Sequence, residues 1–172
     1  THEYCKKIEK ENSKVFKKTG LYIDSYFSAS KIKWIIDNIN ITKELINNNN
    51  LICGTIDTWI IWNLTKRKKH VTDFTNASRT MLFNINNKKW DSDLLKLFKI
   101  PRKILPEVRN SIDDFGEADI FKTKIPISGV AGDQQAALFG QGCYKPGESK
   151  CTYGTGCFLL TNTGSQRINS SA

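Results

Sequence analysis

Two short apolar runs, each followed at once by a stretch with helical periodicity, constrain this chain more than any other feature. The first run is "LICGT" at 51–55, and the apolar residues after it recur on one helical face: Ile56, Trp59, Ile60 and Leu64. The second is "KIPISGVAG" at 124–132, which precedes a helical pattern over Gln134 to Phe139. A buried strand followed by a helix is the repeating unit of α/β domains. We therefore predict an α/β fold, with Thr55 capping the helix that follows the first run.

The clearest amphipathic helix is predicted to begin at Ser28, whose hydroxyl can cap its N-terminus. Its apolar residues occupy positions i, i+3, i+4 and i+7: Ile32, Ile35, Ile36 and Ile39. This spacing places them in one stripe, which we expect to face a core, while Lys31 and Lys33 turn outward.

Four further segments have local signals for their structure. About the first fifteen residues predict an exposed helix that ends before Gly20, and "DSDLLKLFKI" predicts a helix capped by Asp91. "VTDF" and "TMLFNI" are typical of strands, with "TNAS" between them. Near the C-terminus, "SKCTYGTGCFLLTNTG" predicts a hairpin, preceded by a type II turn with Pro146 and Gly147 at its centre.

Composition excludes several classes of protein. The chain has 172 residues and a formal charge of +9, but its lysines are scattered, so we expect no nucleic-acid partner. The densest basic run, Lys66 to His70, is predicted to be a solvated turn. No apolar run approaches the roughly 18 residues of a membrane span, so we expect no membrane association.

Cysteine and histidine usage limits the chemistry. The five cysteines are odd in number and form no C-x-x-C pair, which disfavours a disulfide framework or a zinc site and favours a reducing, cytoplasmic setting. Only two histidines are present. Acid and base chemistry is therefore expected to fall to carboxylates.

Asp133 is the leading candidate for such chemistry. It stands between Gly132 and the tandem amides Gln134 and Gln135, at a predicted strand-to-helix junction. Ligands gather beyond the carboxyl ends of strands in open α/β sheets, so the carboxylate can meet a substrate there. An aspartate at a helix start can also be an N-cap, and the local pattern alone favours that interpretation while leaving both open.

The tip of the predicted hairpin is the second candidate. Gly154 and Gly156 flank Thr155 and permit close backbone approach, and successive N–H groups in such a turn can bind phosphate oxygens. The same residues can also form a plain hairpin turn, because they match neither a Walker loop nor a dinucleotide fingerprint. Sequence pattern alone favours the plain turn and leaves the phosphate turn as an alternative.

Five blocks of the chain, in order, resemble the FGGY carbohydrate kinase family, and within it the kinases that act on glycerol. The blocks are "YFSASKIKWIIDN", "GTIDTWIIWNLT", "TDFTNASRTMLFNI", "GDQQAALFGQ" and "TYGTGCFLLTNTG". The resemblance implies a two-lobed actin-like ATPase (ribonuclease H-like) fold. It also implies Mg²⁺- and ATP-dependent conversion of glycerol to sn-glycerol 3-phosphate.

Matched position by position, the resemblance assigns roles to individual residues. Asp133 corresponds to the catalytic base, and Tyr26, Gln134 and Phe158 correspond to glycerol-binding residues. The ATP phosphate turn corresponds to Gly154, Thr155 and Gly156. The resemblance assigns no metal ligand in this chain, and core packing would explain Phe158 equally well.

The resemblance also implies how the chain is organised. Residues 1–140 correspond to the later half of the N-terminal lobe and 141–172 to the start of the C-terminal lobe, with its phosphate-binding hairpin. The chain lacks the family's D-x-G-T phosphate motif, Arg-Glu pair and adenosine segment, so we expect an internal piece, inactive alone, of a longer enzyme that forms a homo-oligomer. Alternatives are a xylulose or gluconate kinase of the same family, or a non-catalytic nucleotide-binding interaction module.

Overall fold

The computed structural model describes residues 1–120 and 122–169, and the chain folds as two compact units, Thr1–Val130 and Ala131–Ala172. Its helices are α1 (His2–Lys7), η1 (Glu9–Glu11), α2 (Asn12–Thr19), α3 (Ser28–Asn38), α4 (Ile41–Asn47), α5 (Ile56–Leu64), α6 (Phe74–Ala77), α7 (Ser92–Phe98), η2 (Arg102–Ile104) and α8 (Asp133–Gly140). Its strands are β1 (Val71–Asp73), β2 (Phe83–Asn84), β3 (Lys89–Trp90), β4 (Glu107–Arg109), β5 (Glu117–Ala118), β6 (Ile125–Pro126), β7 (Ser149–Tyr153) and β8 (Cys157–Thr161). The predicted α/β class is confirmed.

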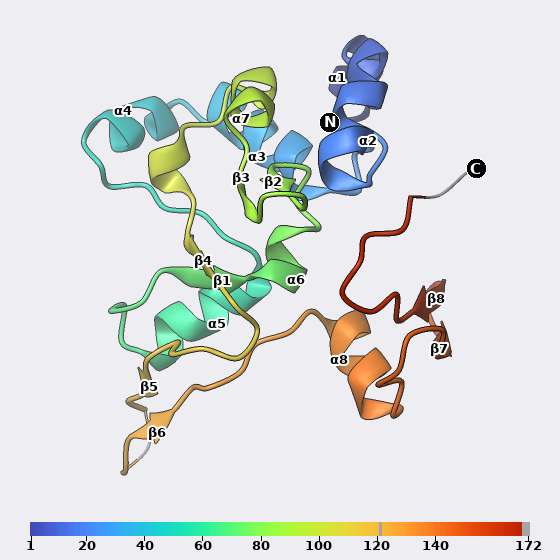
Figure 1. The fold of residues 1–172 in the computed structure, drawn as a ribbon. Helices are drawn as coiled ribbons and strands as arrows, with labels where there is room; N and C mark the ends of the chain where they lie inside the picture. The colour runs from blue at the N-terminus through green and yellow to red at the C-terminus, as the bar shows by residue number, and fades with distance from the viewer. Residues whose placement is uncertain (121, 170–172) are drawn as a thin grey trace. The chain divides into compact units, whose positions relative to one another are not determined.

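The first unit contains a parallel strand pair, β1 and β4, with α5 beside it (Figure 1). Val71 pairs with Glu107 and Asp73 with Arg109. Parallel strands require a long crossover, which here runs through α6, the β2–β3 hairpin and α7. The Thr72 hydroxyl of β1 donates to the Asp57 carboxylate of α5 at 2.6 Å and ties this helix to the strand.

The larger core of this unit lies among α2, α3, α4 and α7. Its buried apolar residues are Val15, Ala29, Ile46, Met81, Leu82, Leu94, Leu95, Phe98, Ile100, Ile104 and Leu105. The predicted cap of α7 is confirmed, because Asp91 accepts hydrogen bonds from the backbone N–H groups of Asp93 and Leu94 at 3.0 and 3.1 Å. Lys18 adds an ion pair to Asp91 at 2.7 Å.

Two predictions about α3 are wrong. In this wholly described helix Phe27 occupies the N-cap position and no side chain supplies a capping bond, so Ser28 does not cap it. Lys33 is buried rather than turned outward, because its ammonium pairs with Asp37 and lies 5.6 Å from the ring centre of Tyr4. The isoleucine stripe is divided: two members pack on the core, Ile32 and Ile36, and two are exposed, Ile35 and Ile39.

The segment before α5 also differs from prediction. Residues 51–55, all of which are described, form no strand; the Cys53 amide makes one backbone bond, to the Ile104 carbonyl. Thr55 does occupy the N-cap position of α5, but its hydroxyl donates to the Asp57 side chain and caps nothing. The buried face of α5 carries Asp57, Thr58 and Ile61, whereas the predicted apolar face is largely exposed: Ile56, Trp59 and Ile60.

Other local predictions are confirmed, some over shorter spans. The N-terminal helix divides into α1, η1 and α2 and ends at Thr19, before Gly20 at φ +71°. Its predicted exposure is only partly correct, because Cys5, Val15 and Thr19 are buried. "VTDF" and "TMLFNI" contain β1 and β2, and "KIPISGVAG" contains β6. The basic run is exposed at Lys66 to Lys68 and half-buried at Lys69 and His70, and Lys66 and Lys68 contact the Asp119 carboxylate at 3.3 and 3.9 Å. Among the described residues, no helix is long and apolar enough to cross a bilayer.

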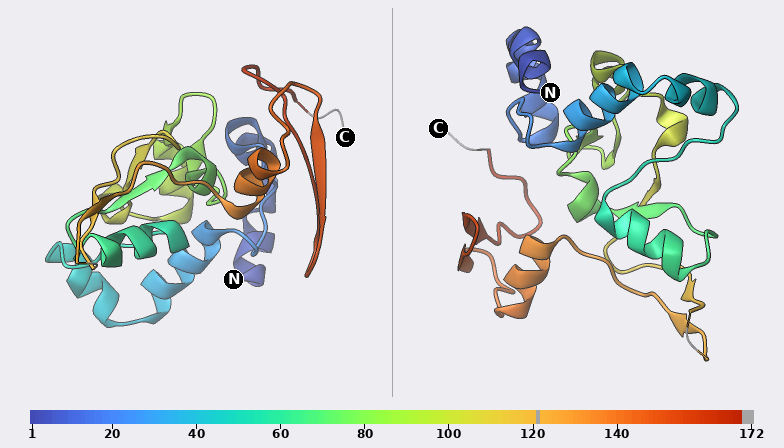
Figure 2. Two further views of the ribbon diagram at one scale, coloured as in Figure 1. Left: turned by 90° about the horizontal axis from the view of Figure 1, so that it is seen from below. Right: turned by 180° about the vertical axis from the view of Figure 1, so that it is seen from behind.

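The second unit consists of α8 and the β7–β8 hairpin, which lie against each other (Figure 2). The hairpin is confirmed over Ser149–Thr161, with Tyr153 paired to Cys157 next to its tip. The turn before it is also confirmed: the Glu148 amide donates to the Lys145 carbonyl at 3.1 Å, and Gly147 has φ +90°. That φ favours glycine at the third position of a type II turn.

Candidate active site

Asp133 is the first residue of α8 and not its cap. Gly132 occupies the N-cap position, and no side-chain bond caps this helix, all of whose residues are described. The Asp133 side chain is exposed, and it accepts a hydrogen bond from the Gln134 amide nitrogen at 3.0 Å. The capping interpretation left open by the sequence is therefore wrong, and the carboxylate is accessible to a ligand.

A chain of polar contacts links Asp133 to the hairpin through Gln134. The Gln134 side chain donates to Asp133 with its nitrogen and accepts from the Lys150 ammonium with its oxygen. Lys150 also donates to the Thr152 hydroxyl at 2.7 Å. Since both ends of the amide are engaged, its orientation is fixed, and the amide nitrogen faces the carboxylate.

Lys150 is a site residue that the sequence did not single out. Only 3% of the residue is exposed, which is rare for lysine unless polar partners satisfy the ammonium. It occupies the one buried position of β7. Once α8 is known to pack against the hairpin, strand alternation places Lys150 on the face of β7 that α8 covers. Its partner Gln134 is 16 residues away in the sequence, so no local pattern points to the contact.

The hairpin tip carries the residues that the sequence predicts to form a phosphate turn. The Gly154 amide donates to the Gly156 carbonyl at 3.0 Å, and Thr155 between them is exposed. A Cβ at Gly154 would meet no atom within 4 Å, so the backbone there is open to a ligand. A Cβ at Gly156 would lie 2.9 Å from the Phe158 ring, which therefore packs directly on the turn.

Tyr26 belongs to the first unit, whereas the other predicted site residues belong to the second. Its side chain is 64% exposed. The Tyr26 amide donates to the Asp24 carboxylate at 2.6 Å, the Phe27 ring lies edge-on at 5.2 Å, and the Lys31 ammonium lies 5.7 Å from the Tyr26 ring centre. These contacts fix the backbone and ring and leave the tyrosine at the surface.

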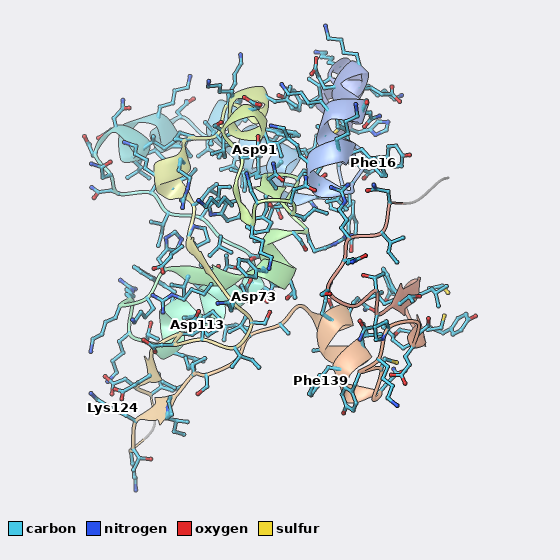
Figure 3. All side chains as sticks on the ribbon, viewed as in Figure 1. Phe16, Asp73, Asp91, Asp113, Lys124 and Phe139 are labelled. Atoms are coloured by element: carbon cyan, nitrogen blue, oxygen red, sulfur yellow. The ribbon has the colours of Figure 1, made fainter. Side chains whose placement is uncertain are left out.

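A buried carboxylate that the sequence did not reveal lies at the carboxyl end of β1. Asp73, labelled in Figure 3, is fully buried. Its carboxylate accepts five hydrogen bonds: from the backbone and side chain of Thr75 at 3.0 and 2.6 Å, from the backbone and side chain of Asn76 at 3.0 and 2.7 Å, and from the Ser111 hydroxyl at 2.6 Å. Burial alone would raise the pKa of Asp73, but the bonds from Ser111, Thr75 and Asn76 outweigh it and lower the pKa.

Asp73 therefore remains ionised and joins β1, α6 and the segment after β4. The hint in the sequence was "DFTN", an aspartate followed at the second and third positions by residues whose N–H groups it can cap. The fifth donor, Ser111, lies 38 residues from Asp73 in the sequence, so no local pattern predicts this hydrogen bond. The contacts indicate an anchor for the backbone at this strand end.

Comparison with known proteins identifies the family. The model of the N-terminal domain of the FGGY family of carbohydrate kinases matches residues 1–140. The chain belongs to the FGGY family of carbohydrate kinases. The resemblance found in its five sequence blocks is thereby confirmed.

Relatives within the family are similar over nearly the whole chain. Glycerol kinase of Clostridium botulinum (strain Langeland) is 58% identical over 174 aligned residues, which cover 99% of this chain and 35% of that protein. The crystal structure of Plasmodium falciparum glycerol kinase with ADP matches with a TM-score of 0.92 and 43% identity, over 98% of this chain and 35% of that one. This FGGY chain thus spans about a third of the length of these relatives.

A more distant solved structure shows the fold alone. Xylulose kinase from Rhodospirillum rubrum matches with a TM-score of 0.76 at 19% identity, over 91% of this chain and 33% of that one. The same backbone arrangement therefore persists where the sequences have diverged. The actin-like ATPase fold predicted from the sequence is confirmed by these neighbours.

Proposed function

We propose that the full-length protein phosphorylates glycerol with ATP to give sn-glycerol 3-phosphate. The observation that carries the proposal is the 58% identity, over 99% of this chain, to the glycerol kinase of Clostridium botulinum. The match to the ADP complex of the Plasmodium falciparum enzyme supports a nucleotide substrate. Because the chain spans about a third of these relatives, the activity is assigned to the whole protein, and residues 1–172 alone are expected to be inactive.

Asp133 is proposed to accept the proton of the attacking hydroxyl. Its exposed carboxylate is held by the Gln134 amide and makes no capping bond to α8, so its oxygens can face a substrate. An ordinary aspartate suffices, because the hydroxyl loses its proton as the bond to phosphorus forms, and a positioned base typically contributes about 10²- to 10⁴-fold. The remainder of catalysis is positioning and electrostatic stabilisation.

Gln134, Tyr26 and Phe158 are proposed to bind glycerol. The fixed Gln134 amide has a second N–H beside the base with which to bond a hydroxyl group, and the exposed Tyr26 phenol can bond another. Phe158 is 38% exposed, and its ring rests on Gly156, so it can offer an apolar surface next to the turn. Hydroxyl recognition by a few placed polar groups against an apolar wall is typical of small-ligand sites.

The hairpin turn is proposed to hold ATP phosphates through Gly154, Thr155 and Gly156. The open space over Gly154 and the exposed Thr155 fit such a ligand. The Gly154 N–H already donates to the Gly156 carbonyl, so the phosphate contacts are assigned to the other backbone N–H groups of the turn. When bound, ATP supplies the transferred phosphoryl group, and Mg²⁺ neutralises the negative charge on that group. Over residues 1–120 and 122–169 no three His, Cys, Asp or Glu side chains cluster as metal ligands would. This fits Mg²⁺, which is usually held by one or two carboxylates together with substrate phosphates.

The test uses the full-length protein in a coupled assay of ADP release with glycerol, xylulose and gluconate as separate substrates. We expect turnover with glycerol to exceed that with the other two by orders of magnitude. Preference for xylulose or gluconate would assign the protein to another FGGY kinase. Binding of Mg-ATP in calorimetry without turnover of any polyol would favour a non-catalytic nucleotide-binding module.

Three properties of the full-length protein remain predictions. We expect it to act in the cytoplasm and to form a homo-oligomer. We also expect no nucleic-acid partner, because the basic charge is dispersed; a binder would show steeply salt-dependent affinity for DNA or RNA.

A further inference from the structure

Cys151 and Cys157 lie on opposite strands of the hairpin, directly behind its tip. Cys151 pairs with Leu159 and Cys157 with Tyr153, so the two cysteines are diagonal neighbours on the same face of the ladder. Their sulfurs are 3.6 Å apart and within hydrogen-bonding distance, and both residues are exposed. The loop between them contains the Gly154–Gly156 turn.

We propose that Cys151 and Cys157 form an oxidation site at which a peroxide converts the two thiols into a disulfide across the base of the phosphate turn. The cross-link itself depends only on the hairpin. Its consequence for turnover rests on the proposed kinase function.

The chemistry balances with one peroxide molecule. The Cys151 thiolate attacks a peroxide oxygen, the O–O bond breaks, and Cys151 becomes a sulfenic acid while the departing oxygen leaves as water after protonation. The Cys157 sulfur then attacks the Cys151 sulfur, the S–S bond forms, the S–O bond breaks, and a second water leaves with the Cys157 proton. Two thiols are oxidised by two electrons, and hydrogen peroxide is reduced to two waters.

The contact between the sulfurs lets one thiol resolve the other. The hydrogen bond with Cys151, followed by desolvation and by the charge of Cys151, raises the pKa of Cys157. The thiolate is the reactive form of cysteine, and at 3.6 Å the second sulfur lies within reach of the sulfenic acid that forms on the first. The same disulfide results whichever of the two reacts first.

The other cysteines are poorer targets. Cys5 and Cys53 lie in the first unit, and burial raises the pKa of both, that of Cys53 to about 12. Cys143 is half-buried after α8 and has no thiol partner among the described residues. Because reactivity follows thiolate character and exposure, oxidation should concentrate on the hairpin pair, and Cys143 serves as the internal comparison.

Closing the disulfide would change the hairpin tip. The sulfurs must approach from 3.6 Å to about 2.05 Å. Diagonal neighbours have Cα atoms about 7 to 8 Å apart, beyond the usual range of about 4.4 to 6.8 Å for disulfides, so the strands must draw together next to the turn. We expect this movement to weaken phosphate binding at Gly154 and Thr155 and to be reversed when a dithiol reduces the bond.

The experiment treats the full-length protein with hydrogen peroxide, alkylates the remaining thiols and digests with trypsin. Cleavage after Lys150 and Arg167 releases both cysteines in one peptide, 151–167, while Cys143 falls in another. We expect the 151–167 peptide to lose two hydrogens and take up no alkylating reagent, and dithiothreitol to restore alkylation at both positions. The Cys151→Ser variant should form no cross-link, and Cys143→Ser should form it normally.

Turnover is measured on the same samples. We expect a loss of at least tenfold in glycerol phosphorylation on oxidation, recovery with dithiothreitol, and no peroxide-induced loss in the Cys151→Ser variant. Two outcomes would overturn the site. In the first, Cys143 is oxidised while both thiols of the 151–167 peptide are alkylated; in the second, the 151–167 peptide carries a sulfinic acid and no cross-link. If the cross-link forms and turnover is unchanged, the claim that the disulfide weakens phosphate binding at the turn is wrong. If the reduced protein does not phosphorylate glycerol, the proposed function fails, and the peptide masses still decide on the site.

Discussion

The buried ammonium of Lys150 donates a hydrogen bond to the side-chain oxygen of Gln134, whose nitrogen in turn donates to the Asp133 carboxylate. A lysine on the hairpin thus fixes the orientation of an amide at the start of α8. Reversing the amide would place its oxygen against the carboxylate and its NH₂ against the ammonium. Both contacts would then be repulsive, so Lys150 selects the arrangement seen.

Lys150→Met should therefore impair catalysis through Gln134. Methionine fills similar space and cannot donate, so the Gln134 oxygen loses its partner and the contact with Asp133 alone holds the amide. Hydrogen bonds to charged groups contribute about 1.5 to 3 kcal/mol, and we expect kcat/KM for glycerol to fall by roughly 10- to 100-fold. Steady-state kinetics of the full-length protein measure this, with exposed Lys145→Met as the matched control. Equal kinetics in the two variants would remove Lys150 from the site.

Gly156→Ala should disturb the phosphate turn through Phe158. The added methyl group would lie 2.9 Å from the phenylalanine ring, so the ring or the turn must shift. We expect KM for ATP to rise several-fold, and the double variant Gly156→Ala/Phe158→Leu to recover part of the loss because leucine vacates that space. Kinetics with varied ATP test this, and a double variant no better than Gly156→Ala alone would contradict the steric explanation.

Asp73→Asn should destabilise the first unit. The amide keeps the shape but loses the charge that five donors surround, and hydrogen bonds to a charged partner are worth more than neutral ones. We expect a loss of about 2 to 4 kcal/mol in the free energy of unfolding at pH 7, measured by urea denaturation of the full-length protein. Exposed Glu44→Gln is the control and should change stability by less than about 0.5 kcal/mol.

The pH dependence of that difference provides a second test. The folded pKa of Asp73 is lowered, so its contribution is fully present above the unfolded pKa of about 3.9 and is lost as pH falls through the folded value. The stability gap between the wild type and Asp73→Asn should therefore narrow as pH falls below about 4. A gap that stays constant down to pH 3 would show that Asp73 is not preferentially ionised in the folded state.

The sequence predicted those features whose signals are local. The Asp91 cap depends on backbone groups two and three residues away, and the hairpin depends on two apolar runs around a glycine turn. Both were confirmed. Asp133 was singled out from its neighbours and from the family resemblance, and its catalytic role stays a prediction; the cap that the pattern alone favoured is not present in the structure.

The sequence failed where a residue depends on distant partners. Residues 51–55 have strand-like composition, but a strand requires a neighbouring ladder. The Thr55 carbonyl accepts from Trp59 in α5, and only Cys53 bonds to the backbone of a distant segment, at Ile104. Lys33 was expected in solvent, yet Tyr4 and Asp37 cover it. Lys150 likewise became a site residue only through Gln134.

The most direct test of the central claim is the turnover of full-length Asp133→Asn. Asparagine preserves the size of the side chain but cannot accept a proton at neutral pH, so we predict that kcat for glycerol phosphorylation falls by about 10²- to 10⁴-fold. The affinities for glycerol and Mg-ATP, measured by calorimetry, should change little. Turnover within a few-fold of the wild type would contradict the assignment of Asp133 as the catalytic base.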